Sequence, residues 1–487
     1  MIEMPYSSIN DDQFYFVRIE AICKGPAITC SPETSVLELS RMMQHHNITG
    51  VVVVENDIPV GIFSIRDLRR LVVESDGDIN GCLARDGMNG LITVRQQDYV
   101  FDAILKMARY KIHRLGVVDA EGKLVGVITD TDLLTLQTRT PLYLNNEIES
   151  AQSVDQLRRI SARMIEMVTL ATRAGADIRG VVQLISHFND AMTMRLIYLL
   201  DREEGVSLPD GATYLVLGSE GRGEQTLRTD QDSAIVYADD LPKKKFPQME
   251  QFANRLIDGL VSLGVPRCPG DTMASNPQWR HSVSEWKQLI DQWIAVPKPE
   301  SMVNFGMFQD LRALHGDQSL ERRLNEHILA EATRNSMFLA YMARNIVRFM
   351  PPLGMFSRFK VERSGEHRGK INLKKAGIFA LTAGVSLLAL EAGIVDGTTW
   401  DKLELLGKRG VLTGADLETV EESFNYLVYL RLHRQLRSLS AGNKPSNYVD
   451  PLVMSDMDRE KLRTAFKGVG TFLNILRDHF QLNLIAS

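Results

Sequence analysis

Two carboxylates one residue apart, Asp230 and Asp232, are the side chains of this chain best suited to chemistry. They directly precede the β-rich run SAIVY. On a strand, side chains at positions i and i+2 project from one face, so the pair can hold one or two hard cations. Shortly upstream, Gly218 and Ser219 follow the apolar run TYLVL, where a bare backbone and a hydroxyl can approach a phosphate. The combination predicts a nucleoside triphosphate with Mg²⁺, or Mn²⁺, as ligand. The alternative is a pair of solvated turn acids.

The longer string GSEGRGEQTLRTDQD, residues 218–232, resembles the pattern of the nucleotidyltransferase superfamily that includes DNA polymerase β. It is more similar to a bacterial protein-modifying branch, glutamine synthetase adenylyltransferase and the uridylyltransferase of the PII protein. It most resembles a family of nucleotidyltransferases that follow pairs of CBS (cystathionine β-synthase) domains, whose substrate is unsettled. The resemblance covers about residues 145–480. It implies transfer of a nucleotide to a protein or small-molecule acceptor.

The superfamily pattern also implies a third carboxylate on a neighbouring strand. The string NFGMFQDLRAL, residues 304–314, offers Asp310, with Arg312 two positions on and on the same strand face. The resemblance therefore predicts that Asp310 completes the metal site with Asp230 and Asp232. The alternative is a structural ion pair between Asp310 and Arg312. Candidates for contacts with triphosphate oxygens are Arg222, Arg228 and Arg312, although arginines are common near glycine-rich loops.

An internal repeat organises the N-terminal part of the chain. Residues 28–68 align with residues 92–133, and each copy has an extended segment, an amphipathic helix, two β-rich runs and a closing helix. The two copies resemble a tandem pair of CBS domains over about residues 20–140. In that family the pair forms a module whose clefts often bind adenosine nucleotides.

Each copy closes with a hydroxyl residue followed three positions later by an aspartate: Ser64 with Asp67, and Thr129 with Asp132. A hydroxyl at a helix N-terminus can meet phosphate beside free backbone N–H groups, and the carboxylate can accept both ribose hydroxyls. We therefore predict that these four residues bind an adenine nucleotide that regulates the protein. The alternative is that they only cap helices.

Periodicity predicts that most of the remaining chain is helical. Apolar residues at helical spacing over 145–205 predict long connector helices, and residues 335–480 predict helices throughout. The apolar stretch 376–390 is too short for a membrane span, so we expect a buried helix. Tryptophans spaced by seven are expected to be core rather than a base-stacking platform: Trp279, Trp286 and Trp293.

The predicted fold is therefore multidomain α+β. Its parts are a tandem CBS pair (1–144), a helical linker (145–208), a polymerase-β-like nucleotidyltransferase α/β domain (209–334) and an all-α substrate-binding domain (335–487).

Composition limits the partners. Lys+Arg 56 against Asp+Glu 61 gives a net charge of −5, which excludes binding of nucleic acid by bulk positive charge. Residues 335–487 carry 21 basic and 15 acidic groups, or +6, which suits an anionic ligand or an acidic partner. Their basic loop at 358–375 either lines the catalytic cleft or is simply solvated. Four cysteines without a CxxC pair, and no secretory signal, indicate a cytoplasmic protein without a membrane segment.

The leading hypothesis is a Mg²⁺-dependent nucleotidyltransferase regulated by adenine nucleotides at the CBS pair. The rival is a catalytically silent nucleotide sensor that acts by binding a partner. Apolar residues on the first helix of each repeat, among them Leu37 and Leu105, predict a homodimer through the CBS module. The alternative is a monomer in which other helices cover those faces.

Overall fold

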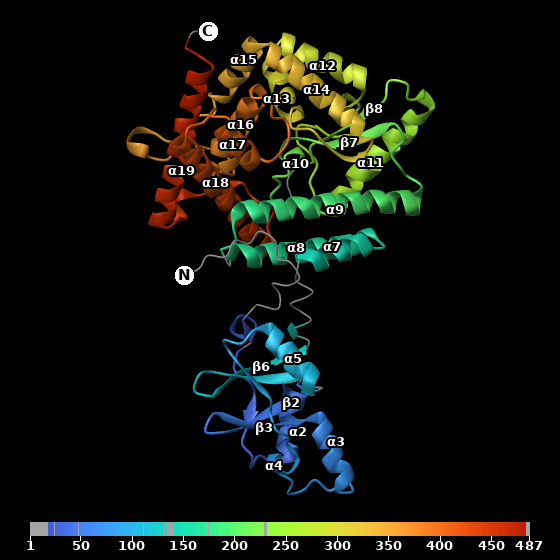
Figure 1. The fold of residues 1–487 in the computed structure, drawn as a ribbon, viewed down its shortest axis with the longest axis vertical. Helices are drawn as coiled ribbons and strands as arrows, with labels where there is room; N and C mark the ends of the chain where they lie inside the picture. The colour runs from blue at the N-terminus through green and yellow to red at the C-terminus, as the bar shows by residue number, and fades with distance from the viewer. Residues whose placement is uncertain are drawn as a thin grey trace. The chain divides into compact units, whose positions relative to one another are not determined.

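The structure is a computed structural model that describes residues 18–23, 25–46, 48–110, 112–130, 132–133, 141–173, 175–227 and 231–483. Two of the predicted site residues, Arg228 and Asp230, lie outside these ranges. The chain divides into two compact units, residues 1–143 and residues 144–487 (Figure 1).

The first unit contains the repeat, and both copies have the same topology. The first copy comprises β1 (Thr29–Cys30), α2 (Val36–His45), β2 (Gly50–Glu55), β3 (Ile58–Ser64) and α3 (Ile65–Glu74), followed by α4 (Ala84–Gly87). The second comprises β4 (Thr93–Arg95), α5 (Val100–Tyr110), β5 (Arg114–Val118) and β6 (Leu124–Thr129). In each copy the first strand pairs parallel to the second, and the second pairs antiparallel to the third. Each sheet packs its own apolar cluster. The predicted repeat is therefore also a repeat of structure.

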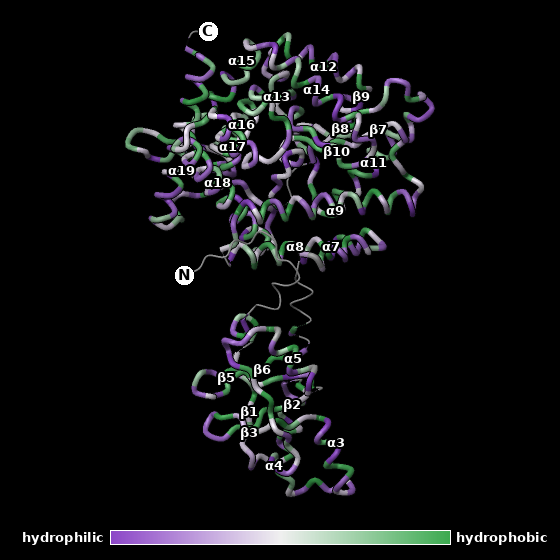
Figure 2. Tube along the Cα trace, viewed as in Figure 1, coloured by the Kyte–Doolittle hydropathy of each residue, from purple (hydrophilic) through white to green (hydrophobic). Residues whose placement is uncertain are grey.

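The second unit begins within α7 (Pro141–Ser150), which is followed by α8 (Val154–Arg173) and α9 (Ile178–Glu204). Asp177 caps α9 by accepting the N–H of Gly180, and Gly205 ends it with a left-handed φ of 65°. Gly180 therefore lies in the first turn of α9. Hydrophilic and hydrophobic residues alternate along α9 in Figure 2, as expected for a helix with one buried face.

A four-stranded sheet forms the centre of the second unit, in the order β10-β7-β8-β9. Its strands are β7 (Ala212–Val216), β8 (Ser233–Tyr237), β9 (Arg280–Ser282) and β10 (Arg312–Gly316). The helices between these strands in the chain are α10 (Gly218–Gly221), α11 (Phe246–Ser262), α12 (Val283–Ala295) and α13 (Pro299–Phe308). Helix α14 (Gln318–Arg334) follows β10. β7 is antiparallel to both of its neighbours. In Figure 1, α12 and α14 lie above the sheet and α9 lies below it.

The string at 304–314 differs from its prediction as a strand. Its first half belongs to α13, which ends at Phe308, and β10 begins only at Arg312. Asp310 therefore lies in the turn between them. A short apolar run does not distinguish helix from strand by periodicity, and here packing of α13 on α12 decides.

The tryptophans are core residues, as predicted. Trp286 is fully buried and its Nε1 donates to the Ile235 carbonyl at 3.0 Å, while Trp279 is 6% exposed. Trp293 packs partly buried against the same core.

The C-terminal part contains α15 (Ser336–Ile346), α16 (Phe379–Glu391), α17 (Thr399–Lys408), α18 (Gly414–Ser440) and α19 (Asp456–His479). It is not entirely helical, because β11 (Ile371–Asn372) pairs with β12 (Tyr448–Val449). The helix α16 is buried over nearly its whole length, which confirms the expected core helix. None of the helices within the described ranges is long and apolar enough to cross a membrane.

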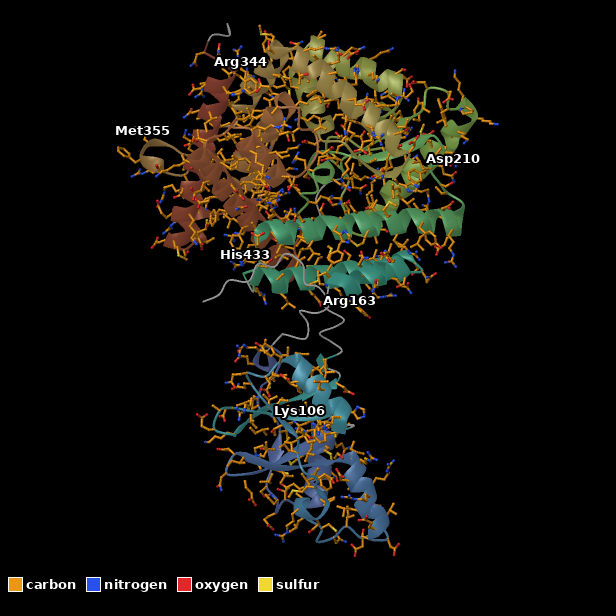
Figure 3. All side chains as sticks on the ribbon, in the orientation of Figure 1. Lys106, Arg163, Asp210, Arg344, Met355 and His433 are labelled. Atoms are coloured by element: carbon orange, nitrogen blue, oxygen red, sulfur yellow. The ribbon has the colours of Figure 1, made fainter. Side chains whose placement is uncertain are left out.

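The basic loop before α16 is mostly solvated. Arg358, Lys360 and Arg363 are exposed, and the preceding tip carries Met355, which projects away from the helices and is 81% exposed (Figure 3). Of the two predictions for this loop, exposure supports the solvated one.

Candidate functional site

Three predicted site segments meet at one edge of the central sheet. Gly218 follows the end of β7, whereas Asp232 precedes β8 and Asp310 comes shortly before β10. Because β7 is antiparallel to both neighbours, its end and their beginnings lie at the same edge. The N–H of Leu217 donates to the Asp232 carbonyl at 2.9 Å, which extends the β7–β8 pairing to this edge. The topology thus brings together residues that are almost a hundred positions apart.

The segment 218–224, here called the glycine loop, needs its glycines for two physical reasons. Gly218 has a left-handed φ of 54°, and a Cβ there would lie 3.7 Å from Asp232 Oδ2. A Cβ on Gly221 would lie only 1.8 Å from the carbonyl oxygen of Asp310, so no side chain fits. Ser219 lies between them in α10 and is half-buried. The loop therefore runs tightly along the segment that carries Asp310.

Arg312, the first residue of β10, holds the glycine loop by hydrogen bonds. Its Nε donates to the carbonyl of Gly221 at 3.1 Å, and its Nη2 donates to the carbonyl of Glu220 and to Asp190 Oδ1, both at 3.0 Å. The alternative ion pair between Asp310 and Arg312 is not formed, since Arg312 pairs with Asp190 instead. A contact of Arg312 with triphosphate stays a prediction.

Asp310 lies in a buried ion cluster. Its Oδ2 accepts from Arg222 Nη1 at 2.6 Å, its Oδ1 accepts from Lys402 Nζ at 2.5 Å, and Ser386 Oγ donates to Oδ1 at 3.0 Å. Burial alone would raise the pKa of Asp310, but Lys402 and Arg222 outweigh it and hold that pKa below its ordinary value. Asp310 is therefore ionised, with both oxygens engaged. Its role as a metal ligand stays a prediction, and so does a role of Arg222 at the triphosphate.

Two of these partners, Ser386 and Lys402, were missed in the sequence, and so was Glu224, which accepts from Arg222 Nε at 3.0 Å. Lys402 had a usable signal, because it stands at helical spacing from Thr399 and Leu406, both of which are buried. A lysine on the apolar side of a helix predicts a buried counter-charge. The sequence does not say where in the chain that counter-charge lies.

Carboxylates gather on the other side of the glycine loop. Glu220 is 8% exposed, and burial, followed by the charges of Asp190 and Asp232, raises its pKa to about 8. Burial and the Asp232 carboxylate also raise the pKa of the Cys268 thiol. Within the described residues no three His, Cys, Asp or Glu side chains are placed to hold a metal, and Asp230 is outside that set. The gathering of carboxylates nevertheless fits a divalent cation, because hard carboxylate oxygens are the donors that Mg²⁺ prefers.

Glu220 gives a testable pH dependence. Its folded-state pKa of about 8 lies above the ordinary value of 4.5, so the folded protein retains a proton that the unfolded chain releases. The corresponding stability is fully present below about pH 4.5 and is lost as the pH rises towards about 8. We expect Glu220→Gln to flatten the pH dependence of the thermal midpoint between pH 5 and 8 in metal-free buffer. An unchanged slope in this variant contradicts the expectation.

In the CBS unit, both candidate aspartates cap helices. Asp67 Oδ2 accepts the N–H and the hydroxyl of Ser64 at 2.9 and 2.5 Å, and its Oδ1 accepts from Asn89 Nδ2 at 2.6 Å. Asp132 Oδ2 accepts the N–H and the hydroxyl of Thr129 at 3.0 and 2.6 Å. The capping alternative is thus part of the structure in both copies. Nucleotide binding at these residues stays a prediction.

A pocket of about 320 Å³ opens beside the ion cluster in the second unit. Its wall includes Arg222 and Asp310, the acidic side chains of Glu321 and Asp396, and Lys402 of α17. The pocket therefore joins the glycine loop to the helical C-terminal part.

Three family models match the chain. "CBS domain" matches residues 19–74 and 88–138. "Putative nucleotidyltransferase DUF294" matches residues 162–300, and "Putative nucleotidyltransferase substrate binding domain" matches residues 336–480. The glycine loop lies in the second match and Lys402 in the third.

Similar proteins align with about a quarter of the chain. Uncharacterized protein MK0525 of Methanopyrus kandleri is 33% identical over 138 residues, 28% of this chain and 70% of that protein. Uncharacterized protein MJ1232 of Methanocaldococcus jannaschii is 31% identical over 108 residues, 22% of this chain and only 35% of that protein. A solved structure of CBS domain protein PAE2072 from Pyrobaculum aerophilum, complexed with AMP, has 29% identity and a TM-score of 0.23, covering 25% of this chain and 99% of that one.

Proposed function

We propose, because models of CBS domains, of a DUF294 nucleotidyltransferase region and of its substrate-binding domain match successive parts of this chain, that it transfers a nucleotide from an NTP to a hydroxyl acceptor. The observation that carries the proposal is the meeting of the glycine loop, Asp232 and the Asp310 segment at one sheet edge. Resemblance to the protein-modifying branch extends the proposal to adenylyl or uridylyl transfer.

In the proposed reaction an acceptor hydroxyl oxygen attacks the α-phosphorus of the NTP. The bond from that phosphorus to the β-phosphate bridge breaks, pyrophosphate leaves, and the hydroxyl proton passes to solvent. The glycine loop, with Ser219, binds the triphosphate, and Asp230 and Asp232 hold Mg²⁺, which when bound neutralises phosphate charge. Asp310 would join them only after its contact with the side chain of Arg222 or Lys402 is broken, since both of its oxygens are engaged.

The test of catalysis is label transfer. Full-length protein is incubated with each α-labelled NTP, Mg²⁺ and native cell lysate, in parallel with an Asp230→Asn/Asp232→Asn variant. We expect label on an acceptor with the wild type and none with the variant. If the variant labels the acceptor as strongly as the wild type, or if neither protein labels any acceptor, the result favours the rival silent sensor.

For regulation, we propose that the CBS unit binds an adenine nucleotide with ribose at Asp67 or Asp132. Replacing either aspartate by Asn is expected to weaken binding by about 1–3 kcal/mol, because each removes a charged acceptor. Calorimetry on the full chain with AMP, ADP and ATP measures this, with the exposed Glu121→Gln as control. If neither substitution changes affinity, the aspartates only cap their helices.

We also propose that the protein is a cytoplasmic homodimer. Its four cysteines are all free thiols, which suits a reducing compartment. Leu37 on α2 and Leu105 on α5 are 49% and 50% exposed, which leaves apolar surface for a second copy.

A further inference from the structure

A closed ring of contacts links the glycine loop to the first turn of α17. Glu224 accepts the backbone N–H of Thr399, the first residue of α17. Glu224 also accepts from Arg222 Nε at 3.0 Å, and Arg222 binds Asp310 at 2.6 Å. Asp310 in turn binds Lys402, one helical turn from Thr399. The ring therefore leaves α17 at Thr399 and returns to it at Lys402.

The charged members of the ring are removed from water. The side chains of Lys402 and Asp310 are each 2% exposed, and that of Arg222 is 11% exposed. Lys402 has a second acceptor in Ser386, whose Oγ is 3.1 Å from Nζ. In such surroundings a charge separated from its partner is costly, so the ring resists opening at any single link.

The glycine loop cannot move independently of this ring. The backbone of Gly221 passes against the Asp310 carbonyl so closely that a Cβ would lie 1.8 Å from it. Arg312 fixes the carbonyls of Glu220 and Gly221 to β10. A displacement of Asp310 therefore displaces the loop.

We propose that Lys402 is a positioning residue for nucleotidyl transfer: a cation of the helical region that fixes the glycine loop through Asp310 and Arg222. The inference rests on the proposed function only in assigning the triphosphate to that loop. Lys402, Arg222 and Asp310 also form part of the wall of the pocket of about 320 Å³. A ligand in the pocket touches this link directly, so that its binding and the position of the loop are coupled.

Hydrogen exchange of the peptide covering residues 218–227 tests the link in the full chain. Its amides include those of Arg222 and Glu224, which donate to the carbonyls of Gly218 and Ser219. We expect Lys402→Met to speed exchange in this peptide by at least about tenfold, because a charge-assisted hydrogen bond is lost. Lys402→Arg, which keeps the charge, should exchange more slowly than Lys402→Met. The control is Lys408→Met, on the exposed side of α17, where Lys408 pairs with Glu404.

A second variant leaves every buried charge in place. Thr399 is the first helical residue of α17, where proline is tolerated, and the preceding Thr398 has the extended backbone that proline requires (φ −68°, ψ 166°). Thr399→Pro removes the N–H that Glu224 accepts, while the Thr399 hydroxyl has no partner to lose. It should speed exchange in the same peptide. If Lys402→Met does not fold, hydrogen exchange in Thr399→Pro decides whether α17 fixes the glycine loop.

Affinity for Mg²⁺·ATP, measured on the same proteins by calorimetry, completes the test. We expect weaker binding in Lys402→Met and Thr399→Pro and wild-type binding in Lys408→Met. The proposal is overturned if exchange in 218–227 stays within about twofold of wild type in both ring variants, or if Lys402→Arg exchanges as fast as Lys402→Met. If the wild type binds no NTP, the proposed function fails, whereas the exchange result still decides the link.

Discussion

Replacing Asp232 by Asn is expected to lower the rate of nucleotidyl transfer by about three orders of magnitude. Asp232 lies at the sheet edge beside Gly218. Its carboxylate is one of the two, with Asp230, that we propose to bind the cation. An amide keeps the shape of the side chain but removes the charge. A bound cation contributes several kcal/mol to transition-state stabilisation, and each 1.4 kcal/mol is about tenfold in rate. The rate is measured as transfer of α-label to acceptor under saturating Mg²⁺.

Asp240→Asn is the matched control, because Asp240 lies exposed in the turn just after β8. It should transfer label at the wild-type rate. An Asp232→Asn protein that keeps more than about a tenth of the wild-type rate contradicts the assignment of Asp232 to the cation.

The second large effect concerns stability. Asp310→Asn is expected to lower the free energy of unfolding of the second unit by about 3–5 kcal/mol, because it leaves Arg222 and Lys402 buried without their shared counter-charge. The unfolding transition of residues 144–487, followed in urea with the full chain, measures the loss. The CBS unit should unfold as in the wild type, since it has its own apolar clusters.

The double variant Asp310→Asn/Lys402→Met separates this effect from simple loss of packing. With one buried cation also removed, we expect it to cost less than the sum of the two single changes, by about 1–3 kcal/mol. Strict additivity would show that Asp310 and Lys402 do not interact.

The fold was predictable where its signal is local or repeated. The repeat at 28–68 and 92–133 was recognised because each copy has the same short-range order of helix and strands, and both copies have the same topology. The strands β7 and β8 were recognised because their apolar runs are bounded by glycines and by acids. The string 304–314 was wrongly predicted, because the periodicity of a short apolar run does not distinguish helix from strand, and packing of α13 on α12 decides its structure.

The location of the site was predictable from the sequence, but the contacts among its side chains were not. The spacing of Gly218, Ser219 and Asp232 directed attention to one sheet edge, and the topology places them there. The partners of Asp310 were not predictable, because Arg222 and Lys402 lie 88 and 92 residues away. No periodicity relates residues so distant, and their pairing depends on how α17 packs. An ion pair with Arg312 was only the alternative to a metal-ligand role for Asp310, and that arginine pairs with Asp190 instead.

The most direct measurement of the central claim follows both ends of the triphosphate. The full-length protein, Mg²⁺ and the fraction that contains the labelled acceptor are incubated in parallel with α-labelled and γ-labelled forms of the preferred NTP. We predict that α-label enters the acceptor while an equal amount of γ-label is released as pyrophosphate, and that Asp232→Asn abolishes both. Entry of γ-label into the acceptor, or its release as inorganic phosphate without transfer of α-label, would contradict nucleotidyl transfer.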